Sequence, residues 1–182
     1  FAEKVLAQTV ALLGICSARV KSNDHLLLSS CIQIQHSVKS LGLLARDYVP
    51  RPLPELPGLH FTSRVATGAD FERIWAVDQP VFRHPERMRH AIALGAVRMF
   101  EGEEGVIGFG ITKLVLPGRP EVEVGIAVDT PYRNRGYAIY MLQQLADLCI
   151  AEGKRPIAGC AEQNSPSRAM GERAGFVARY RL

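Results

Sequence analysis

The stretch "VGIAVDTPYRNRGYA", residues 124–138, links two segments of different periodicity. It begins inside "EVEVGIAV", residues 121–128, whose alternating pattern predicts a β-strand. It ends inside "RGYAIYMLQQLADLCIAEG", residues 135–153, where one apolar face is formed at helical spacing by Ala138, Leu142, Leu145 and Cys149. The stretch is therefore predicted to carry the chain from a strand directly into a helix.

Two arginines and a glycine stand at this junction, as Arg133, Arg135 and Gly136. A helix N-terminus has unpaired N–H groups and a partial positive charge, so it attracts anions. Glycine lets the backbone approach a ligand closely, and the two guanidinium groups add full charges and donors. An isolated turn of this kind is more often an ordinary surface turn, but its place before a helix indicates a cradle for a pyrophosphate.

Other phosphate-binding and catalytic motifs do not occur in the sequence. There is no G-x-x-x-x-G-K-[ST] loop, which argues against a P-loop protein. The "GFG" at residues 108–110 lacks a third glycine and opens no helix, which argues against a dinucleotide-binding fold. There is also no G-x-S-x-G elbow of a serine hydrolase.

A second motif follows the predicted helix. "PIAGCAE", residues 156–162, predicts a strand, and the segment from Asn164 to Phe176 predicts a helix with Ser165 as N-cap and Gly175 as its end. Two ordered motifs of this chain resemble those of the GNAT superfamily of acyl-CoA-dependent N-acetyltransferases. The first is a strand followed by [QR]-x-x-G-x-[GA]. The second is an asparagine before a helix that ends in Gly-Phe. The resemblance is strongest over about residues 121–176.

This resemblance implies a fold and a cofactor site. The fold would be α+β, with a mixed, mostly antiparallel sheet that splays at the strand 121–128 and is flanked by helices. In the splay, the pantetheine arm of acetyl-CoA would take main-chain bonds from Ile126, Ala127 and Val128. The pyrophosphate would sit on six consecutive amides, those of Arg133, Asn134, Arg135, Gly136, Tyr137 and Ala138. Asn164 and Ser167 would face the pantetheine or acyl region.

The family's reaction is the attack of an amine on an acyl thioester. It requires loss of a proton from the amine, because a lysine-type amine has a pKa of about 10.4. Glu123, two residues before Gly125 on the strand that would hold the thioester, matches a glutamate of many relatives and is the candidate base. Glu121 points the same way and is the reserve, although both residues also suit an exposed strand. A strand amide near Val128 would stabilise the oxyanion.

One position departs from the family's pattern. Many members carry a tyrosine four residues before the glycine of the Gly-Phe pair, where it protonates the leaving thiolate, and this chain has Gly171 there. General acid catalysis contributes about 10²–10⁴-fold, and a thiolate with a pKa of about 8.5 already leaves fairly well, so activity can survive this loss. The departure keeps open an alternative, a regulatory module that binds CoA or acyl-CoA without turnover.

The region before the acetyltransferase-like part has a different pattern. Residues 1–47 predict a helical hairpin, whose second helix would run from Asp24 to Asp47 with an apolar stripe. Prolines at positions 50, 52, 54 and 57 make residues 48–59 a predicted linker or strap. Residues 60–182 form the predicted acetyltransferase domain. We expect the hairpin to cover the core, and its docking onto a partner or in a homodimer stays open.

Within the predicted domain, periodicity indicates further elements before the strand 121–128. These are a strand at 60–67, a helix at 68–82 with Asp70 as a cap, a helix at 84–94 and two strands within 96–116. The basic cluster "FRHPERMRH", residues 82–90, suits an acidic acceptor, but a solvated helix face explains it better. The last residues, 176–182, predict a closing strand.

Composition sets the class of protein. The 182 residues are 47% hydrophobic and 22% charged with a net charge of +4, which fits one globular domain with an appendage. We expect neither nucleic acid nor a membrane as partner, because there is no long Lys/Arg run and no bilayer-spanning stretch. Four cysteines without a C-x-x-C pair predict reduced thiols, no metal and a cytoplasmic protein. The expected acceptor is a small-molecule or peptide amine.

Overall fold

The computed structural model describes four stretches of the chain, residues 46–55, 58–115, 117–161 and 163–177. The predicted hairpin, apart from its last two residues, and the end of the expected closing strand lie outside these residues. Within the described stretches, no helix is both long enough and apolar enough to cross a membrane.

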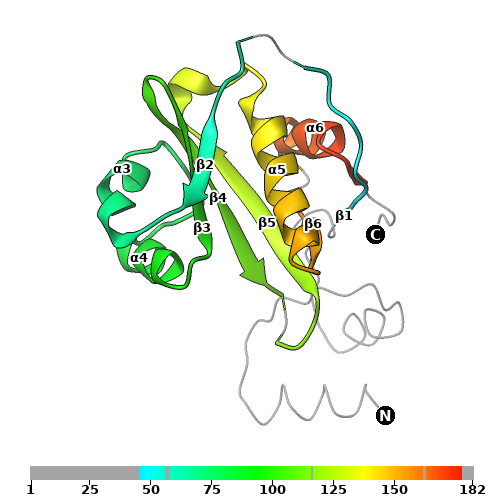
Figure 1. Ribbon diagram of the computed structural model, residues 1–182, viewed down its shortest axis with the longest axis horizontal. Coiled ribbons are helices and arrows are strands. Elements are labelled where there is room, and N and C mark those ends of the chain that lie inside the picture. Colours follow the sequence, from blue (N-terminus) through cyan, green and yellow to red (C-terminus); the bar gives the residue numbers. More distant parts are fainter. Residues whose placement is uncertain (1–45, 56–57, 116, 162, 178–182) are drawn as a thin grey trace.

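A single sheet organises the described part of the chain, which forms seven strands in the order β2-β3-β4-β5-β6-β1-β7 (Figure 1). Their bounds are β1 Arg46–Tyr48, β2 Thr62–Val65, β3 Val97–Gly102, β4 Gly105–Leu114, β5 Glu121–Val128, β6 Arg155–Ala158 and β7 Phe176–Val177. Neighbouring strands are antiparallel except for β5 and β6, which run parallel. The expected mixed, mostly antiparallel sheet is therefore confirmed.

Helices cover both faces of the sheet (Figure 1). On one face lie α3 (Phe71–Trp75), preceded by the 3₁₀ turn η1 (Gly68–Asp70), and α4 (Pro85–Ala93). On the other face lie α5 (Tyr137–Ala151), preceded by the 3₁₀ turn η2 (Thr130–Tyr132), and α6 (Ser165–Arg173). The strand-to-helix passage predicted from residues 124–138 is thus the β5–η2–α5 connection.

Alternation along β5 divides its side chains between two cores. Val122 and Val124 are buried against Leu145 and other side chains of α5. Ala127 is buried in the core that α3 and α4 form with β3 and β4, which includes Phe109. Because side chains alternate along a strand, Glu123 lies on the same face as Ala127, the face covered by α3 and α4.

The strand β1 corrects the prediction for the residues just before the prolines. Arg46 and Asp47 were expected to end a helix, but residues 46–48 form a strand between β6 and β7, antiparallel to both. Tyr48 supplies a tertiary reason, since its ring packs against Phe176 at 5.0 Å between centroids and its hydroxyl donates to Asp147 Oδ1 at 2.7 Å. Asp147 lies 99 residues away in the chain and Phe176 farther still, so local periodicity does not report these partners.

The described residues of the proline-rich segment between β1 and β2 are hydrogen-bonded to α5. Gln143 Nε2 of α5 donates to the Arg51 carbonyl oxygen at 2.6 Å, and the Tyr140 hydroxyl donates to the Pro54 carbonyl oxygen. Its prolines lack N–H donors, so side chains of α5 meet its carbonyl oxygens instead. We call the described residues of this segment the strap, since side chains of α5 bond it at Arg51 and Pro54.

Three predicted element boundaries are wrong, two of them by several residues and one by a single residue. The helix predicted at 68–82 ends at Trp75, because Gln79 precedes a proline and its side chain bonds the main chain of Phe82 at 2.8 and 3.3 Å. The N-cap of α6 is Asn164 rather than Ser165. The strand after α5 ends at Ala158, earlier than predicted.

Candidate active site

The edge between β5 and β6 opens part-way along β5. The two strands are paired only from Glu121 to Glu123, and the last pair joins Glu123 to Ile157. On its other side, β5 stays paired with β4 from Val122 to Val128. The last five residues of β5 therefore face β4 alone, which is the splay expected from the sequence.

Main-chain geometry shows which residues of β5 face the opening. Asp129 N–H donates to the Ile107 carbonyl oxygen of β4 at 2.8 Å. Because successive residues of a strand direct their N–H and C=O groups to opposite sides, Ala127 points toward β4, whereas Ile126 and Val128 point toward the splay. Ile126 and Val128 thus meet the requirement for main-chain contacts with a ligand in the splay, and Ala127 directs its polar groups elsewhere.

The turn after η2 presents several N–H groups in one short stretch. Asn134 has a positive φ of 61°, and Gly136, the N-cap of α5, has a φ of 92°. Asparagine and glycine tolerate this left-handed region best. Among the described residues, none accepts a hydrogen bond from the amides of residues 134–138, whereas the Arg133 amide donates to the Thr130 carbonyl oxygen at 3.2 Å. Amides 134–138 are therefore suited to bind an anion.

The two arginines of the turn have different surroundings. Arg133 Nε donates to the Val128 carbonyl oxygen at 2.9 Å, and its guanidinium lies 3.0 Å from Asp78 Oδ2. Arg135 is exposed, and its guanidinium has no ion-pair partner in the described part of the chain. The charge of Arg133 is therefore partly neutralised by Asp78, while that of Arg135 remains directed at solvent.

The two glutamates of β5 also differ. Glu121 lies 3.3 Å from Arg119 Nε and 3.6 Å from an Arg155 guanidinium nitrogen, so two ion pairs engage its carboxylate. Glu123 is half-buried at the closed end of the splay, opposite Lys113 of β4 in the register. Of the pair, Glu123 is the one at the point where the strands separate.

The remaining predicted cofactor residues sit at the start of α6 and of α5. Asn164 Oδ1 accepts a hydrogen bond from the Ser167 N–H at 3.1 Å, which is an ordinary N-cap contact. Tyr137 packs edge-on against Tyr132 with 5.7 Å between ring centroids, and both join the small core around Phe100. These contacts explain the residues structurally, and their roles toward a cofactor stay predictions.

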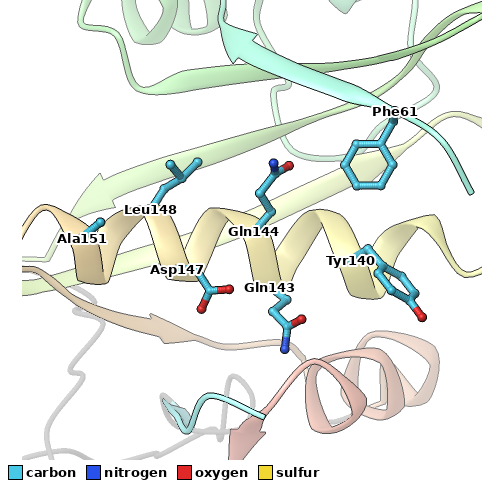
Figure 2. Close-up of a pocket in the computed structure, with 7 residues that line it drawn as sticks. All are labelled: Phe61, Tyr140, Gln143, Gln144, Asp147, Leu148 and Ala151. Atoms are coloured by element: carbon cyan, nitrogen blue, oxygen red, sulfur yellow. The ribbon is translucent and has the colours of Figure 1, made fainter. Parts of the chain in front are cut away.

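Two hollows of the described surface lie away from the splay, along the outer side of α5. One groove of about 1070 Å³ runs between the strap, the β3–β4 turn and Tyr140. A second, of about 490 Å³, continues along α5, where Figure 2 shows Gln144 and Leu148 on the same side of the helix as Phe61. Neither groove includes Glu123 or the turn at 134–138.

A comparison with protein families decides what this architecture is. The family model described as "Acetyltransferase (GNAT) domain" matches residues 60–177. The chain belongs to the GNAT acetyltransferase family. The splay beside β5 and the turn before α5 are therefore features of a GNAT domain, as the motif resemblance implied. No curated protein matches the chain.

Solved structures support the same fold. A GNAT-family acetyltransferase from Colwellia psychrerythraea superposes with a TM-score of 0.69 at 14% identity and covers 88% of this chain. This chain spans 60% of the length of that protein. A Salmonella typhimurium protein solved with its cofactor acetyl-CoA has a TM-score of 0.53 at 21% identity, covering 64% of this chain and 79% of its own. The ribosomal-protein-S18-alanine N-acetyltransferase from Escherichia coli has a TM-score of 0.53 at 20% identity, covering 64% and 77%. At these identities the likeness is one of fold.

The described part of the GNAT domain contains two free cysteines. It contains no group of three or more His, Cys, Asp and Glu side chains that could hold a metal ion. Cys149 is a buried free thiol whose pKa is raised by burial, and Cys160 is a half-buried free thiol. A raised pKa disfavours the thiolate, so Cys149 is suited to packing rather than to nucleophilic attack.

Two residues near the turn, Asp78 and Asp129, were not predicted from the sequence. Asp129 Oδ1 accepts from the Thr130 N–H at 2.9 Å and from the Asp78 N–H at 3.1 Å. The Asp-Thr-Pro order is a local sign of a cap at Asp129, so that role was predictable. Asp78 lies 51 residues from its Asp129 partner, and no local pattern marks it.

Proposed function

We propose that this GNAT domain is an N-acetyltransferase that moves an acetyl group from acetyl-CoA to a primary amine. The observation that carries the proposal is the open edge of β5 leading to a turn with available N–H groups. An open strand edge offers main-chain bonds to an extended arm with amides, and the turn offers N–H groups to a diphosphate. An acyl-CoA carries both parts in this order. The acetyl-CoA of the Salmonella typhimurium neighbour adds support from fold likeness.

The span of the strand is consistent with this ligand. Glu123 and Val128 are five residues apart on β5, which corresponds to about 17 Å along a strand. The diphosphate would bind beyond Val128, on the amides of 134–138, and the arm would run back toward Glu123. The acyl group would then lie at the closed end of the splay, beside a half-buried carboxylate.

In the proposed reaction, the amine nitrogen forms a bond to the carbonyl carbon of the acetyl-CoA thioester and the C–S bond breaks. Glu123 would take the proton that the amine loses, directly or through one water. Glu121 is the weaker candidate, because its carboxylate is engaged by Arg119 and Arg155 and lies farther from the open part of the splay. The N–H of Ile126 is the candidate donor to the oxyanion, because it is on the splay side of β5 and nearer the acyl end than Val128, which lies about 17 Å from Glu123 along the strand.

The leaving thiolate has no tyrosine at position 171 to protonate it, since Gly171 is buried in α6. A thiol has a pKa of about 8.5, so its anion leaves near neutral pH and takes a proton from water. The same observation favours a second candidate function, a GNAT module that binds acyl-CoA without turnover. We prefer the enzyme because Glu123 stands at the closed end of the splay.

A thiol-release assay separates these functions. Acetyl-CoA is incubated with the protein and a panel of amines that contains a polyamine, free amino acids, peptides with a free N-terminus and lysine peptides. The enzyme predicts release of free CoA that one amine class stimulates, together with a mass increase of one acetyl group on that amine. Binding of acetyl-CoA with slow, amine-independent hydrolysis would favour the non-catalytic module, and no binding at millimolar concentration would contradict both.

A further inference from the structure

Asp78, in the segment between α3 and α4, is bonded to the turn that follows β5. The Arg133 guanidinium donates to the Asp78 carbonyl oxygen at 2.6 Å and lies 3.0 Å from Asp78 Oδ2. Thr130 Oγ1 donates to the same Oδ2 at 2.9 Å, and the Asp78 N–H donates to Asp129 Oδ1 at 3.1 Å. We name this network the clasp, and it consists of Asp78, Asp129, Thr130 and Arg133.

The clasp anchors the residue from which the turn starts. Arg133 is the C-cap of η2, and its Nε also donates to the Val128 carbonyl oxygen at the end of β5, at 2.9 Å. The next residue, Asn134, has a φ of 61°. Asparagine tolerates this conformation but also has others open to it, so a fixed neighbour helps to hold it there. Fixing Arg133 from both sides therefore favours one orientation of the N–H groups of 134–138.

The segment that carries Asp78 is itself held in place. Val77 is buried in the core of α3 and α4. Phe82 packs against Phe109 of β4 with 6.0 Å between ring centroids, and the Gln79 side chain bonds the main chain of Phe82 at both its N–H and its C=O. Asp78 is thus presented to the turn from a packed platform.

We propose that Asp78 is a positioning residue for diphosphate binding, acting through Arg133 without touching the ligand. The proposal rests on the proposed function, since it takes acyl-CoA as the ligand of the amides at 134–138. As a surface ion pair, with side chains 68% and 43% exposed, Asp78 and Arg133 would contribute little to overall stability. Their effect is local, because the bonds of the clasp share atoms and hold one turn.

Substitution of Asp78 distinguishes a positioning role from simple electrostatic repulsion, because the two predict opposite changes in CoA affinity. CoA is a polyanion, so removing a nearby carboxylate lowers repulsion and, by charge alone, tightens binding. The clasp instead predicts that Asp78→Ala weakens CoA binding about threefold to tenfold. Asp78→Asn keeps a side-chain oxygen that accepts from Arg133 and Thr130, so it should bind CoA within about twofold of the wild type.

Titration calorimetry with CoA on the full chain measures these affinities. Glu86→Ala is the matched control, since it removes a carboxylate whose side chain is 72% exposed on the neighbouring α4 and outside the clasp. Backbone order parameters of the ligand-free proteins, from amide ¹⁵N relaxation, supply a second measurement. The amides at 134–138 should have lower order parameters in Asp78→Ala than in the wild type, Asp78→Asn or Glu86→Ala.

The outcomes distinguish a failure of the proposed role of Asp78 from a failure of the proposed function. Equal or tighter CoA binding by Asp78→Ala, with unchanged order parameters at 134–138, would overturn the role of Asp78. If the wild type binds no CoA, the proposed function fails. The order parameters of the ligand-free proteins still decide in that case whether Asp78 orders the turn, and unchanged values would reject the clasp as well.

Discussion

A Cβ atom added to Gly108 would stand 2.1 Å from the carbonyl oxygen of Ala127. The two strands β4 and β5 approach so closely there that no side chain fits, and the obstacle is backbone, which cannot rotate away. Two residues on, a Cβ at Gly110 would meet Leu145 of α5 at 2.9 Å. The "GFG" of residues 108–110, which resembled part of a dinucleotide motif, is therefore a packing device that brings β5 and α5 against β4.

Gly108→Ala should lower the free energy of unfolding by about 3 kcal/mol, because the added methyl group forces the backbones of β4 and β5 apart. Gly68→Ala is the control, since a Cβ there meets nothing within 4 Å and the residue lies outside the left-handed region. Urea denaturation followed by circular dichroism compares the two. Similar stabilities for both variants would refute the close approach of β4 and β5.

Glu123→Gln should lower kcat of the amine-stimulated reaction by about 10²–10³-fold, because the amide cannot take the amine's proton. The affinity for CoA should change by less than about twofold, since the substitution keeps size and shape. Steady-state kinetics and calorimetry test the two parts separately. Glu121→Gln is the control and should retain most of kcat, and a pH–rate profile unchanged in Glu123→Gln would remove Glu123 as the base.

Gly136→Ala should weaken CoA binding about tenfold, because the φ of 92° costs an alanine about 1–2 kcal/mol and the turn would relax away from its anion-binding shape. Gly153→Ala is the matched control. Gly153 also has a positive φ, of 71°, but it follows the opposite end of α5. Both variants should lose stability in thermal melts, and only Gly136→Ala should lose affinity. A comparable loss of affinity in both would contradict a local role for the turn.

Asp70→Asn should destabilise the fold by about 2 kcal/mol at pH 7. The Asp70 carboxylate is buried and accepts from Arg64 at 2.6 and 2.7 Å and from the Thr67 N–H and Oγ1 at 2.8 Å. The Arg64 contact, followed by the Thr67 bonds, lowers the pKa of Asp70 far below its usual value. A lowered folded pKa gives stability that is complete above the unfolded pKa of about 3.9 and is lost as pH falls below it.

Urea unfolding at pH 7 and at pH 3 measures this dependence. The difference between wild type and Asp70→Asn should shrink at pH 3, because the wild type then loses part of the same contribution. Glu86→Gln, an exposed carboxylate, should differ from wild type by less than about 0.5 kcal/mol at either pH. An equal difference at both pH values would mean that the charge of Asp70 is not what stabilises the fold.

The elements that the sequence predicted well are those with local signals. The alternation of β5, the apolar stripe of α5 and the glycines at 153 and 175, with φ of 71° and 102°, each report structure within a few residues. The strand–turn–helix order of the candidate site was therefore predictable, including the unpaired amides of the helix N-terminus.

The elements that the sequence missed depend on distant partners. Residues 46–48 continue a helix-like pattern, and only pairing with β6 and β7 and the contact of Tyr48 with Asp147 make them a strand. The partner of Arg133, Asp78, lies 55 residues away and could not be found by local reasoning, whereas the role of Arg133 toward a phosphate stays a prediction. The motif thus predicted a positive charge at this position, whereas the carboxylate that pairs with it could be identified only from the fold.

The most direct test of the central claim is an amide NMR titration of the full chain with CoA. We predict that binding shifts the amide resonances of 134–138 together with those of Ile126 and Val128, which face the splay, while Gly153, just beyond the far end of α5, is unaffected. A phosphate-only ligand such as inorganic pyrophosphate should shift the turn but not β5. No shift at 134–138 with millimolar CoA, or shifts confined to the grooves along α5, would contradict the account.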